Sequence, residues 1–265
     1  MNRENFLILL FHVLLLGWLF EVLGTPRVPV LSFHRILKDA DSYGYLNLSQ
    51  NDFINILNNL RDAGCTPYSP DKPWNPFKCQ ILLSFDDSTE DHFNWVIPYL
   101  RDKNWPSLFF VMGTSLKDMQ PVSGLDYHWF ASHAYLDRSL LHEIYTDVSV
   151  LMKELDQTDE EMKRLGMKTL PWFALPRGEY NDQTVKILSS RFEKIFSVDP
   201  DYMNPEEPGL QGRFMLSRTN SYEKMLDWIL KSMPQYRVDV LLPVFFLLLV
   251  DLVLLCRFAR YCMNL

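Results

Sequence analysis

An apolar run ends in two adjacent carboxylates at Ile81-Leu82-Leu83-Ser84-Phe85-Asp86-Asp87-Ser88. A buried strand that stops in Asp-Asp delivers both side chains to the rim of a sheet or barrel. Neighbouring carboxylates repel each other, so a nearby cation tends to hold one of them ionised while the other becomes a proton acceptor. A metal-dependent hydrolase needs this arrangement, with one Asp to ligate the metal and one to activate water. An isolated Asp-Asp pair is more often a solvated turn, so the interpretation depends on the rest of the chain.

Short apolar runs alternate with amphipathic segments through most of the sequence. The apolar runs predict strands near residues 28–33, 81–85, 107–112, 129–132, 172–175, 194–198 and 214–217. Helical spacing predicts helices over residues 51–63, 90–103, 139–156, 182–191 and 221–231. This alternation indicates an α/β fold with a parallel sheet and outer helices. Sites in such folds collect at the carboxyl ends of strands, where Asp86, Asp87, His133 and Pro176 are all predicted to lie.

Several segments resemble, in order, the motifs of the polysaccharide deacetylases, the NodB-homology enzymes of carbohydrate esterase family 4. The Asp-Asp segment resembles the family's Thr-Phe-Asp-Asp-Gly signature. The other matching segments are Val28–Ile36 for the opening strand, Pro98–Leu100 and Trp105–Val111 for the following helix and strand, Ser132-His133 for the histidine motif, and Phe173–Asn181 for the third motif. The resemblance extends over roughly residues 28–220. The resemblance implies a distorted (β/α)7 barrel. Many family members have Arg at the position of Ala174, whereas the subgroup that acts on biofilm poly-β-1,6-N-acetylglucosamine commonly has Ala there, so this chain most resembles that subgroup.

The resemblance also assigns roles to individual residues. Asp86 would be the catalytic base that takes a proton from a metal-bound water. Asp87 and His133 would ligate a divalent metal, for which zinc fits a carboxylate–histidine set. In the family a backbone N–H of the third motif helps to bind the oxyanion, and that position falls on Arg177, between Pro176 and Gly178.

This sequence departs from the family pattern at three motif positions. The second metal-binding histidine is missing, and the expected positions hold Asp137 and Arg138. Asp137 can ligate a divalent cation and Arg138 cannot, so the ligands are either Asp87, His133 and Asp137, or an incomplete set that binds no metal. Ser88 replaces a Gly that would permit positive φ. Arg177 replaces a Tyr.

The remaining histidines have plainer interpretations. His34 follows the first strand and is family-like, although a hydrogen-bonded structural role fits it equally well. His128 and His142 are interpreted as ordinary solvated or capping residues. Arg213 and Arg218 flank the last predicted strand, and either could contact the site or remain a solvated charge.

Composition and the two ends bear on cellular location. The net charge of −7 argues against a nucleic-acid partner, and 48% hydrophobic residues suffice for one large domain.

We expect a signal peptide or membrane anchor over residues 1–24, a deacetylase-like domain over 25–236, and a transmembrane helix with a short cytoplasmic tail over 237–265. Basic residues flanking both apolar segments place both ends in the cytoplasm and the domain outside, at the cell membrane.

Cysteine usage leaves two alternatives open. Cys65 and Cys79 are the only cysteines of the expected outer domain. Either they form a disulfide, which an oxidising compartment would permit, or they remain two free thiols.

The resemblance therefore implies metal-dependent N-deacetylation of an exported polysaccharide that contains N-acetylglucosamine. Its partners would be that polymer, the membrane, and the machinery that synthesises or exports the polymer. Two alternatives stand beside this hypothesis. One is a catalytically degenerate module that binds glycan or an assembly partner, and the other is a deacetylase of chitin-like or peptidoglycan glycan.

Overall fold

The computed structural model describes residues 26–39, 44–75, 78–121, 124–141, 147–217 and 222–232, with the single residues 246 and 250. Within these residues no helix is long and apolar enough to cross a bilayer. Apart from Phe246 and Val250, the predicted segments 1–24 and 237–265 lie outside the described part, and their membrane assignment stays a prediction.

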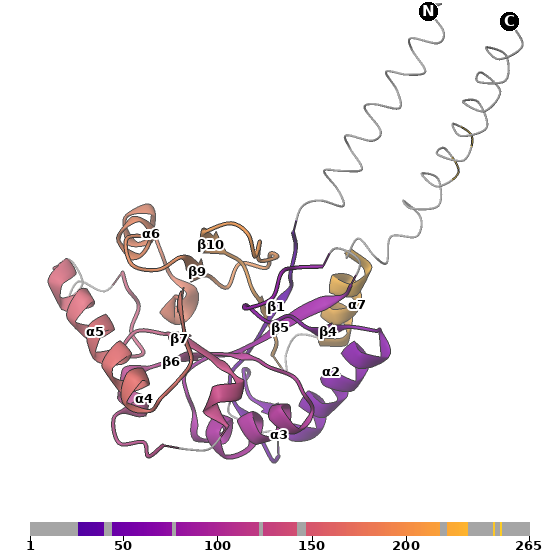
Figure 1. The fold of residues 1–265 in the computed structure, drawn as a ribbon, viewed down its shortest axis with the longest axis horizontal. Helices are drawn as coiled ribbons and strands as arrows, with labels where there is room; N and C mark the ends of the chain where they lie inside the picture. Colours follow the sequence, from indigo (N-terminus) through magenta and orange to yellow (C-terminus); the bar gives the residue numbers. More distant parts are fainter. Residues whose placement is uncertain are drawn as a thin grey trace, which may run out of the picture.

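A curved, mostly parallel sheet forms the centre of the domain (Figure 1). Its strands run in the order β10-β9-β8-β7-β6-β5-β1-β11, and β4 also pairs with β5. The strands are β1 (Val30–Phe33), β4 (Thr66–Pro67), β5 (Gln80–Phe85), β6 (Leu108–Val111), β7 (Trp129–Ser132), β8 (Thr169–Ala174), β9 (Lys194–Phe196), β10 (Gly209–Gln211) and β11 (Phe214–Met215). All seven predicted strands are therefore confirmed. A separate parallel pair joins β2 (Ile36–Leu37) and β3 (Leu48–Ser49).

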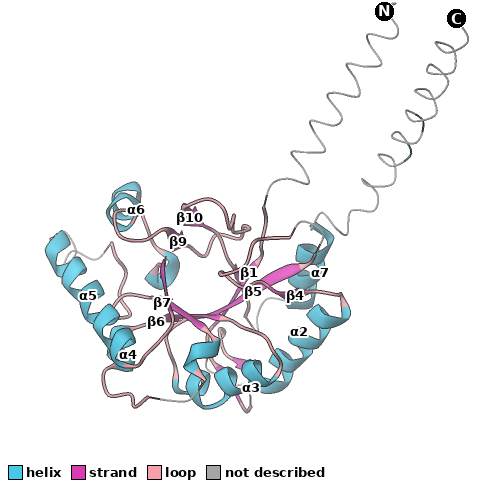
Figure 2. Ribbon diagram, in the orientation of Figure 1, coloured by secondary structure: helices cyan, strands magenta, loops and turns pink. Residues whose placement is uncertain are grey.

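Helices flank the sheet on its outer side, as Figure 2 shows. They are α2 (Gln50–Asp62), a π-helical turn η1 (His92–Val96) that continues into α3 (Ile97–Asp102), α4 (Gly113–Leu116), α5 (Val148–Arg164), α6 (Asp182–Leu188) and α7 (Tyr222–Ser232). Two 3-10 turns complete the set, η2 (Leu125–Tyr127) and η4 (Pro176–Gly178). The parallel α/β class predicted from the alternation of patterns is confirmed.

One predicted helix was wrong in its position. The helix expected over residues 139–156 begins at Val148 and continues to Arg164. Asp147 caps it, because its carboxylate accepts a hydrogen bond from the Ser149 amide at 2.9 Å. Residues 135–140 form bends and a turn instead, and His142 lies outside the described residues.

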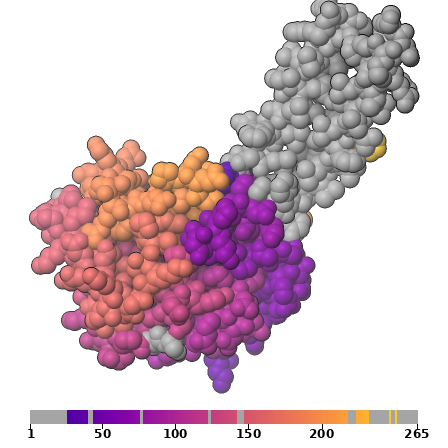
Figure 3. Space-filling view, viewed as in Figure 1, coloured from indigo at the N-terminus to yellow at the C-terminus, as the bar shows by residue number. Residues whose placement is uncertain are grey.

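The barrel is open, which differs from a closed (β/α)7 arrangement. The described strand order ends at β10 on one side and at β11 on the other, with no pairing between these two. Residues 197–213 leave β9, form β10 and lead to the start of β11, and the Arg213 amide donates to the Asp199 carbonyl on the way. Val28 pairs with Met203, so the start of the domain lies against this segment (Figure 3).

Two apolar layers lie on opposite sides of the sheet. The outer layer, under the helices, includes Leu31, Phe33, Ile81, Leu83, Phe85, Phe109 and Phe130. The inner layer, inside the curve of the sheet, includes Val30, Leu82, Phe110, Trp129, Ala131, Trp172 and Phe196. Each strand alternates between the layers with the two-residue period of a β-strand, and burial on both sides explains the continuous apolar runs.

Candidate active site

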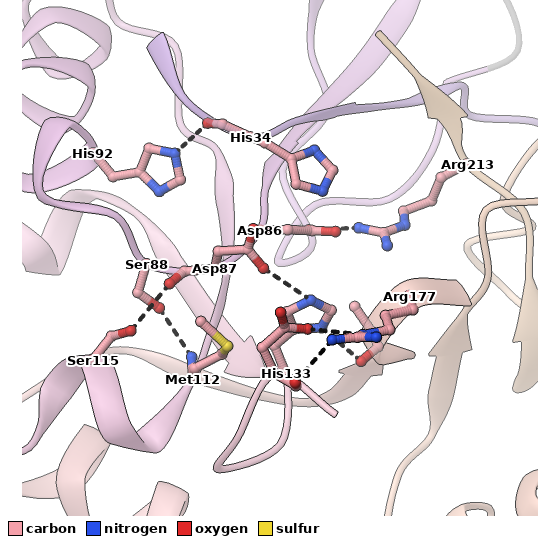
Figure 4. A network of polar contacts seen from close by, with 12 residues as sticks. His34, Asp86, Asp87, Ser88, His92, Met112, Ser115, His133, Arg177 and Arg213 are labelled. Carbon is pink, nitrogen blue, oxygen red and sulfur yellow. Dashed lines mark hydrogen bonds and ion pairs between the residues drawn. The ribbon is translucent and has the colours of Figure 1, made fainter. Parts of the chain in front are cut away.

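The polar residues of the site continue the inward-facing period of the strands. Val30 and Leu82 belong to the inner layer, and Ala131 does so on β7. His34 and Asp86 each lie four residues further along, and His133 lies two residues after Ala131. Because parallel strands end on the same side of a sheet, these side chains meet at the carboxyl end of the barrel interior (Figure 4).

Asp86 forms a buried ion pair with Arg213. The Arg213 Nη1 atom donates to Asp86 Oδ1 at 2.7 Å, and the side chains are 0% and 3% exposed. Burial by itself would raise the pKa of Asp86, but the charges of Arg213, His133 and His34 outweigh it and lower this pKa to about 2. Arg213 also donates from Nε to the Ser197 carbonyl at 3.1 Å, so it joins the ends of β9 and β5 across the interior. Asp86 is therefore held as a carboxylate.

Asp87 and His133 form a second contact pair. Their Oδ1 and Nε2 atoms lie 3.4 Å apart. The Nδ1 atom of His133 donates to the Ala174 carbonyl at 2.8 Å, which fixes the ring so that Nε2 faces Asp87. Burial opposes protonation of His133, but the hydrogen bond and charge of Asp87 and the charge of Asp86 raise its pKa overall. Burial likewise opposes ionisation of Asp87, and the contact with His133 lowers its pKa.

The turn that holds the two aspartates has an unusual backbone. Asp87 has a φ of 74° and Ser88 a φ of 53°, a region in which non-glycine residues are strained. Ser88 therefore occupies the conformation that a Gly would favour at this position. Its hydroxyl accepts a hydrogen bond from the Met112 amide at 2.9 Å, and Ser115 Oγ donates to the Asp87 carbonyl at 3.2 Å. These two contacts stabilise the strained turn.

His34 also belongs to the site. The negative charges of Asp86 and Asp87 act on it, but burial is the largest influence and lowers its pKa. Its Nδ1 atom is buried and has no hydrogen-bond partner among the described residues. The backbone on either side is held in place, because the His34 carbonyl accepts from His92 Nε2 and the Ile36 amide donates to Asp91 Oδ2 at 2.7 Å. Figure 4 shows the ring facing the same space as Asp86 and Arg213.

Asp137 is not assembled with Asp87 and His133. Its side chain is 60% exposed and pairs with Arg177, whose Nε atom lies 3.5 Å from Asp137 Oδ1. Arg177 Nη2 also donates to the Asp137 backbone carbonyl at 3.4 Å. The convergence expected from the sequence is therefore absent here, and the ligand role of Asp137 stays a prediction.

The third motif offers one backbone donor. Pro176 has no N–H, and the Gly178 amide already donates to the Leu175 carbonyl at 2.9 Å. The Arg177 amide is therefore the group of this turn that can serve an oxyanion. Arg177 and Gly178 have φ values of 61° and 70°, which bend the chain sharply after β8.

The donors fit a divalent cation in part. A carboxylate and an imidazole nitrogen are ligands that zinc prefers, and Asp87 and His133 present such atoms to each other. The hydrogen bond from His133 to Ala174 is the outer contact that orients metal-binding histidines. In the described part of the chain, no group of three or more His, Cys, Asp or Glu residues is positioned for a metal. Asp87 and His133 are therefore two candidate ligands that face each other, and a third ligand would have to come from a residue that moves.

Sequence reasoning found the aspartates and His133 but not the full set of site residues. The sequence alone leaves the roles of Arg213 and His34 open, although the two-residue period from Val30 places His34 on the inner face. His128 is buried rather than solvated, and its ring bonds the Ser107 amide and the Ile97 carbonyl at 3.3 and 3.1 Å. No local sequence signal distinguishes Arg213 from Arg218, because the contact with Asp86 depends on the return of the chain at β11.

Comparison with known proteins connects this geometry to a family. Residues 75–191 match the family model described as polysaccharide deacetylase. A search of curated proteins found no match.

Several solved structures share the fold. IcaB from Ammonifex degensii superposes with a TM-score of 0.61 at 20% identity, over 77% of this chain and 97% of that one. The deacetylase PplD from Streptococcus pyogenes gives 0.63 at 20% identity, over 77% and 98%. A de-N-acetylase from Aggregatibacter actinomycetemcomitans gives 0.63 at 17% identity, over 76% and 99%.

Proposed function

We propose that this chain, whose residues 75–191 match the family model described as polysaccharide deacetylase, removes acetyl groups from an exported polymer of N-acetylglucosamine. One observation carries the proposal. The ends of separate strands bring a buried, ionised Asp86 next to an Asp87–His133 pair, with His34 facing the same space. This set combines a proton acceptor, a candidate cation site and a second proton carrier.

The chemistry can be assigned to this chain's own residues. Asp86, ionised by Arg213, accepts the proton of a water as that water attacks the acetamide carbonyl. The Arg177 amide lies on the turn suited to receive the oxyanion. His34 is neutral before reaction and faces the same space as Asp86, so it can take over the proton that Asp86 accepts from the water and deliver it to the leaving amine. The negative charge of Asp87 favours the protonated form of His34 during this transfer. A divalent cation held by Asp87 and His133 would polarise the carbonyl and acidify water.

A cavity beside the site supports a glycan as the substrate. Its volume is about 440 Å³, and Ser88, Phe93, Asn94, Thr114 and Asp118 line part of it. Ser88 connects this cavity to the aspartate turn. Hydroxyl, amide and carboxylate groups beside one aromatic ring suit a sugar unit, which presents hydroxyls at its edge and C–H groups on its face.

The polymer we propose is β-1,6-linked poly-N-acetylglucosamine. Ala174 contributes no charge at the position where many family members have Arg. The positive charge beside Asp86 comes instead from the Arg213 guanidinium, on the other side of the barrel.

We further propose that the domain acts outside the cytoplasm, anchored to the membrane. The Cys65–Cys79 disulfide is of the kind that forms in oxidising compartments, and it supports this location.

Acetate release tests the function directly. Purified full-length protein, supplied with zinc, is incubated side by side with β-1,6- and β-1,4-linked N-acetylglucosamine oligomers. We expect release from the β-1,6 series, near-complete loss in Asp86→Asn, and no change in the exposed control Asp62→Asn. Full activity in Asp86→Asn would refute the role of Asp86. Preference for β-1,4 oligomers would favour a chitin-like or peptidoglycan substrate.

A binding module without chemistry is the second candidate. The exposed Asp137–Arg177 pair favours it, because that pair leaves two protein ligands for a metal. Protein that binds oligosaccharide, retains no divalent ion after purification without chelators, and releases no acetate would establish this alternative.

A further inference from the structure

The carboxylate that would complete the metal ligands is already bound to a guanidinium of the same chain. Asp137 Oδ1 lies 3.5 Å from Arg177 Nε, and its backbone carbonyl accepts from Arg177 Nη2. Arg177 therefore contacts this residue at two points. Among the described residues, no other ion pair of Asp137 lies within 4.0 Å.

The fold brings this pair to the edge of the metal position. Ala134, directly after His133, has a φ of 62°, and the carbonyls of Ala134 and Tyr135 accept from the amides of Gly113 and Thr114, so the chain stays beside the carboxyl end of β6. Arg177 lies on the adjacent turn after β8. His133 is bonded to Ala174 at 2.8 Å, so the segments that carry Asp137 and Arg177 are connected at His133 as well. Figure 4 shows Arg177 on the His133 side of the site.

Both partners are free to separate. The side chains of Arg177 and Asp137 are 58% and 60% exposed, and exposed pairs of this geometry are weak. A divalent cation attracts a carboxylate more strongly than a monovalent guanidinium does, and it repels the guanidinium. Asp137 can therefore exchange one cation for the other at small cost, whereas Asp86, in its buried pair, cannot.

We propose that Arg177 competes with the metal for Asp137. In the metal-free protein Arg177 holds Asp137, and a divalent cation bound by Asp87 and His133 draws Asp137 away from it. Arg177 therefore sets the metal affinity of the site, and its release accompanies metal binding. This inference rests on the metal-assisted function proposed above, but it concerns metal affinity and is measured without any turnover.

Calorimetric titration of zinc into metal-free full-length protein tests the competition. Arg177→Gln should bind zinc about two- to five-fold more tightly than the wild type, the range expected from removing an exposed pair. Asp137→Asn should bind at least about ten-fold more weakly, as expected for loss of a charged ligand. In the double variant Arg177→Gln/Asp137→Asn, the gain from Arg177→Gln should disappear, because the competed carboxylate is gone.

A matched control separates the specific pair from general charge. Arg138→Gln removes the same charge from the residue next to Asp137 and should change the affinity far less than Arg177→Gln. Equal affinities in wild type and Arg177→Gln, equal effects of Arg138→Gln and Arg177→Gln, or unaltered zinc binding in Asp137→Asn would each overturn the proposal. If these shifts appear without acetate release, the competition stands and the deacetylase function fails. If acetate is released and the shifts are absent, the reverse holds.

Discussion

Replacing Arg213 by Met removes the cation from a carboxylate that has almost no contact with solvent. Asp86 is 3% exposed and bonded at 2.7 Å, so the variant leaves a buried, unpaired charge. Such a loss costs about 3–5 kcal/mol of unfolding free energy. The variant should therefore unfold at a markedly lower denaturant concentration at pH 7, as followed by tryptophan fluorescence of the full-length protein.

The pH dependence identifies Asp86 as the source of this cost. In the wild type, Arg213 helps to lower the pKa of Asp86 from 3.8 to about 2. The lowered pKa contributes about 2 kcal/mol of stability above pH 4, which is lost as the pH falls toward 2. Burial is the largest influence on this pKa, so without Arg213 we expect the pKa of Asp86 to rise above its unfolded value and acid to stabilise the variant. The deficit of Arg213→Met should therefore shrink as the pH falls from 7 to 4.

A partly exposed arginine provides the control. Arg191 pairs with Asp156 and Asp159, whose side chains are 65% and 48% exposed. Arg191→Met should cost less than about 1 kcal/mol and show no comparable dependence on pH. A deficit for Arg213→Met that is absent, or equal at pH 7 and pH 4, would refute the assignment of the buried ion pair.

Three further outcomes are expected. Burial is the main cause that lowers the pKa of His128 from 6.5 to about 4, so the unfolding free energy should fall by about 3 kcal/mol as the pH drops from 6.5 to 4. In denaturant titrations over this pH range, the unfolding free energy of His128→Gln should depend less on pH than that of the wild type. An unchanged pH dependence in the variant would contradict the buried, neutral state of His128. Reduction of Cys65–Cys79 should lower the unfolding free energy by about 2–4 kcal/mol, and Cys65→Ser/Cys79→Ser should be as unstable as the reduced protein but insensitive to reductant. His34→Asn should lower kcat for acetate release at least about 100-fold, while its denaturation midpoint stays within the error of the wild-type value. If the denaturation midpoint also falls clearly, His34 has a structural role instead.

Local sequence carried much of the fold. The apolar runs predicted every strand of the main parallel sheet except the short strands β4 and β10, because strands buried on both faces need continuous apolar residues. The separate pair β2–β3 was also not predicted. The helix predicted over residues 139–156 was misplaced, because the apolar period of the sequence does not reveal the cap at Asp147 that precedes the start of α5 at Val148. The disulfide was left open, because spacing alone does not show that Thr66–Pro67 pairs with β5 beside Cys79.

The sequence by itself determined which chemistry is available, namely two carboxylates after a buried strand and a histidine after another. Only the tertiary structure decided how these groups are paired. Arg213 reaches Asp86 across 127 residues of chain, and Arg177 reaches Asp137 across 40. Such contacts depend on which strand ends lie next to each other and on burial, which sets the strength of each charge interaction. The same two residue types therefore form a buried pair that holds Asp86 ionised and an exposed pair that a metal ion can open.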